Sequence, residues 1–316
     1  MMIFVLMYMI SFHLVMSGDD WFLVWLGLEV NMMMFIMIVF KQSSKLIVES
    51  CMSYFFIQSL GSAIFMMVFY INSEYMDLFL CLVLSYKIGA GPFFYWFPSI
   101  CSGISWMSCF ILMFFQKIIP LMLIGMFISW VIFVILIMSL IMGVFGSFNQ
   151  CNLKRLIAYS SVYHLGWILL CIVIDSLFWI NYLLLYMIMV FPVIFFMKYK
   201  DVKNLSEMML IKGKEWIIIL MMSMAGIPPF LGFFLKWFTF VSVMKVSFVC
   251  MIILILSSIV MFYVYFRMMY DILLGYFNVG DWMDYLMNGS NKNISVDFLS
   301  MVGMLVGVFV GLWLLF

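Results

Sequence analysis

Apolar segments long enough to cross a bilayer recur along almost the whole chain of 316 residues. A helix crosses the roughly 30 Å hydrocarbon layer in about 20 residues, and its backbone satisfies its own hydrogen bonds there. Only 9% of the residues are charged and 68% are hydrophobic, whereas soluble domains carry about 25% charge. We therefore expect an all-α polytopic membrane protein with about 11 transmembrane helices and no separate soluble domain.

The expected spans are separated by polar or helix-breaking residues. They cover residues 2–17, 21–40, 50–71, 76–97, 104–124, 128–148, 156–174, 177–197, 215–240, 247–270 and 297–316. Residues 104–148 are too long for one span, so the chain is expected to turn near Gly125 to Ser129, with Pro120 as a kink. The N-terminal segment lacks a basic region and a cleavage site, so we expect it to be retained as the first span. Residues 271–296 are polar and aromatic, which favours an interfacial segment before the C-terminal helix.

Loop charges predict the orientation of the chain. Basic residues gather in every second loop, which are the loops on one side of the membrane. They lie at positions 41, 45, 154, 155, 198, 200, 203, 212 and 214. The opposite loops hold acidic residues at positions 19, 20, 74 and 175, with Lys245 as a basic exception. Because Lys and Arg accumulate on the side from which a protein is inserted, the N-terminus is expected on the basic side.

Several functions are disfavoured by composition. A net charge of +1 gives no electrostatic basis for a nucleic-acid partner. The seven cysteines are scattered without a CxxC pair and there are two histidines, so we expect neither a metal site nor a disulfide framework. No GxGxxG fingerprint, iron–sulfur cysteine cluster or haem ligand pattern occurs, and we therefore expect no cofactor site on this chain.

Four ionisable residues lie inside expected spans: Glu29, Lys87, Lys117 and Lys236. At a 1.5 Å rise, Glu29 lies about 12 Å and Lys87 about 16 Å along their helices, too deep to reach water easily. A charge at mid-membrane costs roughly 2.5–3.5 kcal/mol, so such residues usually have a function. Desolvation disfavours the charged form, which allows proton exchange near neutral pH and favours a proton relay.

Structural interpretations remain open for each of these residues. Glu29 and Lys87 could form a static ion pair that fixes helix packing. Lys117 could lie near the interface if its span boundary is shifted, and Lys236 could snorkel from the end of its helix. His164 in AYSSVYHLGW could be a packing residue, or it could relay protons with the hydroxyls beside it.

Two spans contain Gly and Pro breaks, in GAGPFFYWFP and AGIPPFLGFF, and each has a lysine nearby. Paired interrupted spans are typical of transport sites built from inverted repeats. The chain is therefore expected to form a single antiporter-like domain over residues 1–316, with approximate repeats at 1–124 and 128–270. Ordinary proline kinks are the alternative.

The segments that carry these features resemble a known family. WLGLEVNMMMFI, YKIGAGPFFYWFPSICSGISWMSCFILMFFQKIIP, GVFGSFNQCNLKRLIAYSSVYHLGW and MAGIPPFLGFFLKW are similar, in order and spacing, to motifs of mitochondrial NADH-ubiquinone oxidoreductase chain 2. The resemblance runs from the second span to the ninth. It implies an antiporter-like membrane subunit of respiratory complex I, in a shortened animal form that lacks three helices of bacterial relatives.

The resemblance also implies roles and partners. The family's relay glutamate falls on Glu29 and its relay lysines on Lys87, Lys117 and Lys236, and His164 matches the motif as a further candidate. It implies proton translocation across the mitochondrial inner membrane, with the N-terminus in the matrix. NADH, FMN, iron–sulfur clusters and ubiquinone would act on other subunits, chains 4 and 4L and accessory subunits would be neighbours, and cardiolipin is a candidate bound lipid. The rivals are an independent cation/proton antiporter and a structural subunit without its own proton path.

Overall fold

The computed structural model describes residues 2–18, 20–40, 44–71, 75–174, 178–209, 214–228, 230–244 and 248–274. In these residues the secondary structure is helical, apart from an isolated β-bridge between Asn152 and Asn204. The chain divides into two compact units. The first is Met1–Gly146 with Lys154–Ser176, and the second is Ser147–Leu153 with Leu177–Phe316.

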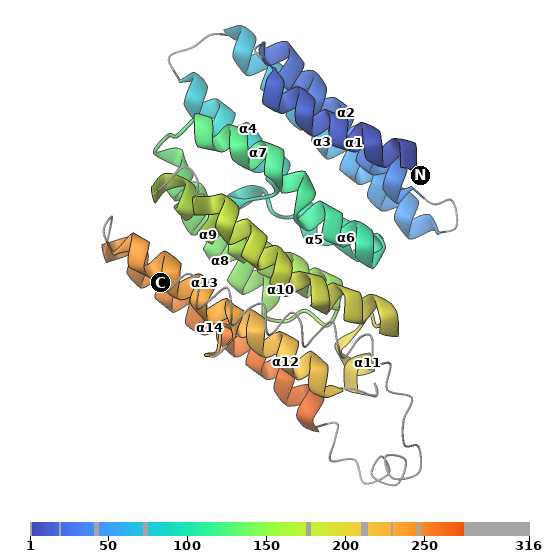
Figure 1. The fold of residues 1–316 in the computed structure, drawn as a ribbon, viewed down its shortest axis with the longest axis vertical. Coiled ribbons are helices and arrows are strands. Elements are labelled where there is room, and N and C mark those ends of the chain that lie inside the picture. The colour runs from blue at the N-terminus through green and yellow to red at the C-terminus, as the bar shows by residue number, and fades with distance from the viewer. Residues whose placement is uncertain are drawn as a thin grey trace. The chain divides into compact units, whose positions relative to one another are not determined.

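The first unit is a bundle of antiparallel neighbours in which α1 packs on α2, α2 on α3, α3 on α4 and α5, and α4 on α7 (Figure 1). Short connections between apolar helices favour this up-and-down arrangement. Its elements are α1 Met2–Ser17, α2 Trp21–Val39, α3 Lys45–Ile71, α4 Met76–Ile88, η1 Gly91–Phe93, α5 Trp96–Gly103, α6 Trp106–Met113, α7 Phe115–Met126, α8 Val131–Ser147 and α9 Leu153–Ile174.

The first helix break follows α4. Gly89 has a φ of 74°, which lies in the left-handed region that favours glycine, and its amide donates to the carbonyl oxygens of Ser85 and Tyr86. The chain then passes through η1 into α5. The break expected in GAGPFFYWFP within the span 76–97 thus lies at Gly89, so that the helix ends at Ile88 and Lys87 lies in its last turn.

The long apolar stretch after α5 also differs in detail from the expectation. The turn near Gly125 to Ser129 is confirmed, since α7 ends at Met126 and α8 begins at Val131. Pro120 lies inside α7. The helix is interrupted earlier, at Phe114 between α6 and α7.

The second unit contains the other helix break. Its elements are α10 Phe178–Lys200, α11 Leu205–Met209, α12 Lys214–Ala225, α13 Leu231–Val243 and α14 Phe248–Leu274. Helices α12 and α13 pack against each other, and both contact α10 and α14. Gly226, at a φ of 82°, follows α12 and forms the break expected in AGIPPFLGFF within the span 215–240.

Seven helices or helix pairs are long and apolar enough to cross a membrane, and α1, α8, α12 and α13 are shorter apolar helices. Ten expected spans fall on described helices, so the chain is a multi-pass membrane protein. Helix α14 runs to Leu274, four residues into the segment expected to be interfacial. The remaining expectations for 275–296 and 297–316, and for loop residues 19, 41, 74, 175, 212 and 245, lie outside the described residues.

Candidate functional site

The three lysines expected inside the membrane are buried. Lys87 is 6%, Lys117 3% and Lys236 7% exposed. Lys87 and Lys117 lie in the first unit, on α4 and α7, and Lys236 lies in the second unit on α13. Each ammonium group is therefore removed from bulk solvent, and its neighbours decide what it can do.

Glu29 on α2 is held beside Lys87. The Ser62 hydroxyl, on α3, donates a hydrogen bond to the Glu29 carboxylate, and that carboxylate interacts electrostatically with Lys87. Gly61 makes room for the lysine, since a Cβ at this position would lie 2.9 Å from Lys87 Cγ. Glu29 on α2 and Lys87 on α4 therefore interact electrostatically within the bundle, so movement of one charge changes the proton affinity of the other.

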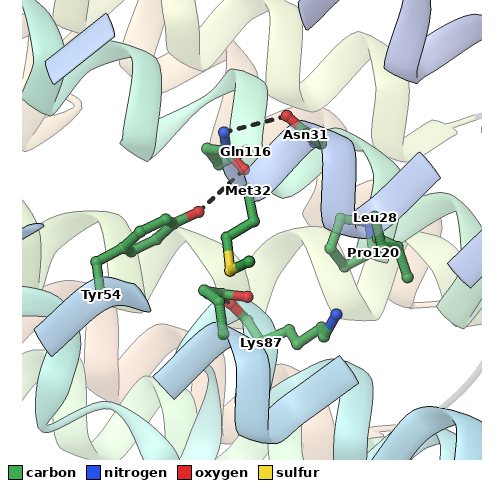
Figure 2. A pocket seen from close by; sticks show the side chains of 8 residues that line it. Leu28, Asn31, Met32, Tyr54, Lys87, Gln116 and Pro120 are labelled. Atoms are coloured by element: carbon green, nitrogen blue, oxygen red, sulfur yellow. Dashed lines mark hydrogen bonds between the residues drawn. The ribbon is translucent and has the colours of Figure 1, made fainter. Parts of the chain in front are cut away.

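A small polar cavity adjoins Lys87 (Figure 2). It has a volume of about 20 Å³, which is room for one water molecule. Three side-chain amides, of Asn31, Gln58 and Gln116, and the Tyr54 hydroxyl line it. The Tyr54 hydroxyl donates to Gln116 Oε1 at 3.2 Å, and Gln116 Nε2 donates to Asn31 Oδ1 at 3.2 Å. Gln58 Nε2 donates to the Lys87 carbonyl oxygen at 2.9 Å, which satisfies an acceptor that the end of α4 leaves open.

Lys117 follows Gln116 on α7 and reaches a different helix. Its Nζ donates to Ser161 Oγ on α9 at 3.2 Å and lies 4.4 Å from the centroid of the Phe97 ring. The Ser161 hydroxyl donates a hydrogen bond to the Ala158 carbonyl oxygen at 2.7 Å. The Lys117 ammonium group is therefore held by one hydroxyl and one aromatic face in an apolar part of the bundle.

His164 lies three residues after Ser161 on α9 and is 1% exposed. Residues three apart share a helix face, so His164 belongs to the same side of α9 as the hydroxyl that binds Lys117. Its ring meets that of Tyr163 edge to face, with centroids 5.3 Å apart. In the first unit, Glu29 therefore lies near Lys87. His164 lies one turn along α9 from Ser161, which accepts a hydrogen bond from Lys117.

Lys236 points back to the break between α12 and α13. Its Nζ donates to the Ala225 carbonyl oxygen at 2.9 Å, which is an acceptor freed by the end of α12. The lysine also lines a largely apolar cavity of about 280 Å³, together with Gly226 and Ser258. Its contacts are therefore those of a lysine at a helix break, and not those of a side chain that extends beyond the end of its helix.

Replacing Gly226 by alanine is expected to disturb Lys236 directly. A non-glycine residue costs about 1–2 kcal/mol at a left-handed φ, and the added Cβ would lie 3.0 Å from Lys236 Nζ. We expect a lower thermal stability of the protein in detergent, measured as its unfolding temperature. Gly125→Ala is the control, because its Cβ would meet only Ile172, at 3.9 Å; equal effects of the two substitutions would contradict the expectation.

The sequence analysis missed the polar residues between the lysines. Asn31, Tyr54, Gln58 and Ser62 stand out as polar positions in apolar spans, and the last three lie four residues apart on α3. That spacing places them on one helix face. It could have predicted a polar stripe. It could not have shown that Gln116 joins the stripe from α7.

No group of three metal-ligating side chains suitable for a metal ion occurs among the residues that the structure describes. The ionisable residues of the candidate site are three lysines, one glutamate and one histidine; Glu29 and Lys117 each bond to a hydroxyl, and Lys236 bonds to a carbonyl oxygen. Such groups move and hold protons. The site therefore holds residue types that can take up and release protons.

Comparisons with known proteins agree with this architecture. Residues 63–262 match the family model of the NADH:quinone oxidoreductase/Mrp antiporter transmembrane region. The chain is 32% identical to NADH-ubiquinone oxidoreductase chain 2 of Anopheles gambiae and 34% identical to that of Aedes aegypti, with 96% of each chain covered in both cases.

Solved structures share the fold at low sequence identity. A chain of respiratory complex I from Thermus thermophilus matches with a TM-score of 0.79 and 19% identity, over 98% of this chain and 78% of that chain. A chain of the Mrp complex from Dietzia matches with a TM-score of 0.68 and 17% identity, over 85% and 58%. Interrupted membrane helices with lysines buried beside the breaks define an antiporter-like membrane subunit. The chain belongs to the NADH-ubiquinone oxidoreductase chain 2 family.

Proposed function

We propose that the chain is a membrane-arm subunit of mitochondrial respiratory complex I that translocates protons while electrons pass from NADH to ubiquinone on other subunits. The observation that carries this proposal is the set of polar contacts through the first unit. It begins with Ser62 and Glu29, includes Lys87 and its polar cavity, and ends with Lys117 bound to Ser161. Membership of the chain 2 family supports the same function.

In the proposed mechanism Glu29 controls the proton affinity of Lys87. When the carboxylate is near, it stabilises the ammonium form, and when it withdraws, burial favours release of the proton. Lys117 would receive a proton on the path across the first unit, with His164 available one turn along α9 from its partner Ser161. Lys236 would serve terminal exchange in the second unit, where the Ala225 carbonyl oxygen holds its ammonium group.

Finer parts of the assignment rest on the family resemblance. The protein would lie in the mitochondrial inner membrane with its N-terminus in the matrix, and chains 4 and 4L and accessory subunits would be its neighbours. NADH, FMN, iron–sulfur clusters and ubiquinone would be bound by other subunits of the complex. Cardiolipin would be a lipid bound to this chain. We also propose one antiporter-like domain over residues 1–316, with repeats at 1–124 and 128–270. The breaks at Gly89 and Gly226 support this division.

The test of this assignment is a native gel of mildly solubilised mitochondrial membranes, stained for NADH dehydrogenase activity and followed by mass spectrometry. We expect this chain in the active band together with the other complex I subunits. Recovery only outside that band would contradict the proposal and favour an independent cation/proton antiporter, which would work without NADH. An unrelated abundant inner-membrane protein serves as the control for contamination of the band.

A further inference from the structure

Two buried thiols meet beside the turn between α5 and α6. Cys101 on α5 and Cys109 on α6 are both free cysteines with 0% exposure, and their thiol groups share a hydrogen bond. Helix α5 ends at Gly103 and α6 begins at Trp106, so two residues separate the helices. No CxxC spacing marks the two cysteines in the sequence, and the turn is what brings their sulfur atoms together.

The turn lies next to a basic residue and is partly exposed. Lys154 Nζ donates to the carbonyl oxygen of Ile104, in the turn, at 2.5 Å. Ser102 and Ser105 are half-buried and lie within about one helical turn of the nearer thiol. Burial of the sulfur atoms excludes charged reagents, because a charge loses its hydration there. A small uncharged molecule reaches the thiols when the turn opens locally.

An ammonium group lies beside the thiol pair. Lys117 Nζ is 4.4 Å from the centroid of the Phe97 ring, and Phe97 lies one turn before Cys101 on the same face of α5. Lys117 interacts electrostatically with both Cys101 and Cys109. A thiol attacks an oxidant as the negatively charged thiolate, and a neighbouring cation attracts that charge. Two thiols in contact are therefore combined with a cation that assists their reaction.

We propose that Cys101 and Cys109 form an oxidative modification site, at which a hydroperoxide converts the two thiols into a disulfide bond between α5 and α6. One sulfur attacks a peroxide oxygen, the O–O bond breaks, and the thiol proton passes to the leaving oxygen, which gives a sulfenic acid and an alcohol. The second thiol then displaces water from the sulfenic acid. Overall, two thiols and ROOH give a disulfide, ROH and water, so the sulfur atoms lose two electrons and the peroxide gains two.

The disulfide bond slows proton transfer at Lys117, and this part of the inference rests on the proposed proton-translocating function. A disulfide bond holds its sulfur atoms at about 2.05 Å, closer than two hydrogen-bonded thiols, so α5 and α6 are drawn together beside the lysine. Displacement of a reacting group by about 1 Å lowers rates by tenfold or more. We therefore expect oxidation to cause about a tenfold loss of NADH-driven pumping, which a reducing dithiol reverses.

Mass spectrometry after peroxide treatment of the assembled complex tests the modification site. The complex is exposed to hydrogen peroxide, free thiols are blocked with N-ethylmaleimide in denaturant, and peptides are prepared without reduction. We expect Cys101 and Cys109 to be joined in a product that lacks their two thiol hydrogens and disappears after reduction with dithiothreitol. If both cysteines instead carry the maleimide at peroxide concentrations that oxidise the exposed Cys151, the inference is overturned.

Cys101→Ala and Cys109→Ala test the effect on pumping. Neither variant can form the bond, so pumping should be normal without peroxide and resistant to it. Cys171→Ala is the matched control, because Cys171 on α9 is also 0% exposed, and its pumping should stay as sensitive to peroxide as that of the unchanged chain. Equal sensitivity of all three variants would show that the loss arises elsewhere and would overturn the effect on Lys117.

The outcomes separate this inference from the proposed function. If the disulfide bond forms but pumping after oxidation equals that of Cys101→Ala, the effect on Lys117 is wrong and the proton path stands. If Lys87→Met leaves pumping normal in assembled complex, the proposed function fails, whereas recovery of the joined cysteines still establishes the modification site. The chemical test needs no substitution, so it decides the site even if the cysteine variants fail to assemble.

Discussion

Replacing Lys87 by methionine is expected to reduce NADH-driven proton pumping at least about tenfold while the complex still assembles. Methionine has a chain of similar length, so it fills the space beside Gly61 and leaves the Ser62 to Glu29 hydrogen bond in place. It cannot hold a proton. The measurement is the pH gradient formed by vesicles that contain the complex, set against the amount of assembled complex on a native gel.

Lys200→Met is the matched control for this substitution. Lys200 lies in the last turn of α10 and is exposed, so the same chemical change there removes a solvated charge. Pumping should remain normal. A structural role for Lys87 predicts the reverse of our expectation, namely less assembled complex with normal pumping for each assembled molecule. That result would support a static pair of Glu29 and Lys87.

Gly143→Ala is expected to lower the amount of assembled protein several-fold. Helices α8 and α9 approach closely at this glycine, and an added Cβ would lie 2.6 Å from the Tyr163 backbone nitrogen and 2.7 Å from its Cα. Backbone atoms cannot move aside as a flexible side chain can, so the helices must separate. Overpacking of this kind costs about 1–3 kcal/mol or more, and small residues at membrane helix contacts exist to permit such approach.

The separation would also move α9, which carries Ser161 and His164 next to Tyr163. We therefore expect any complex that does assemble to pump slowly. Native gels and thermal stability in detergent measure the first effect, and vesicle assays measure the second. Gly125→Ala should be neutral because its Cβ meets only ordinary contact distances; a similar loss for both variants would show that packing at Gly143 is not the cause.

The sequence predicted most of the fold because the membrane imposes a strong constraint. The first expected span, 2–17, coincides with α1, and the second, 21–40, differs from α2 by one residue. The breaks were also predictable from their glycines and prolines. Their exact geometry was not, since Gly89 ends α4 at Ile88 and so places Lys87 at a helix end instead of mid-helix.

The candidate site was predicted in part. Ionisable residues stand out in apolar spans because burial of an isolated charge is costly, and this singled out Glu29, Lys87, Lys117 and Lys236 without any structure. The neutral polar residues between them did not stand out in the same way. Gln116 looks like one polar residue beside a lysine until α3 and α2 supply Tyr54 and Asn31.

The sequence by itself therefore determined that the chain spans a membrane, where the two glycine- and proline-rich helix breaks lie, and which residues can hold a proton there. These properties follow from local hydropathy, from backbone chemistry and from the cost of burying charge. Only the tertiary structure decided which groups meet. A span that is apolar on every face carries no signal for its rotation, so the contact of Lys117 with Ser161, 44 positions away, depends on how α7 and α9 pack.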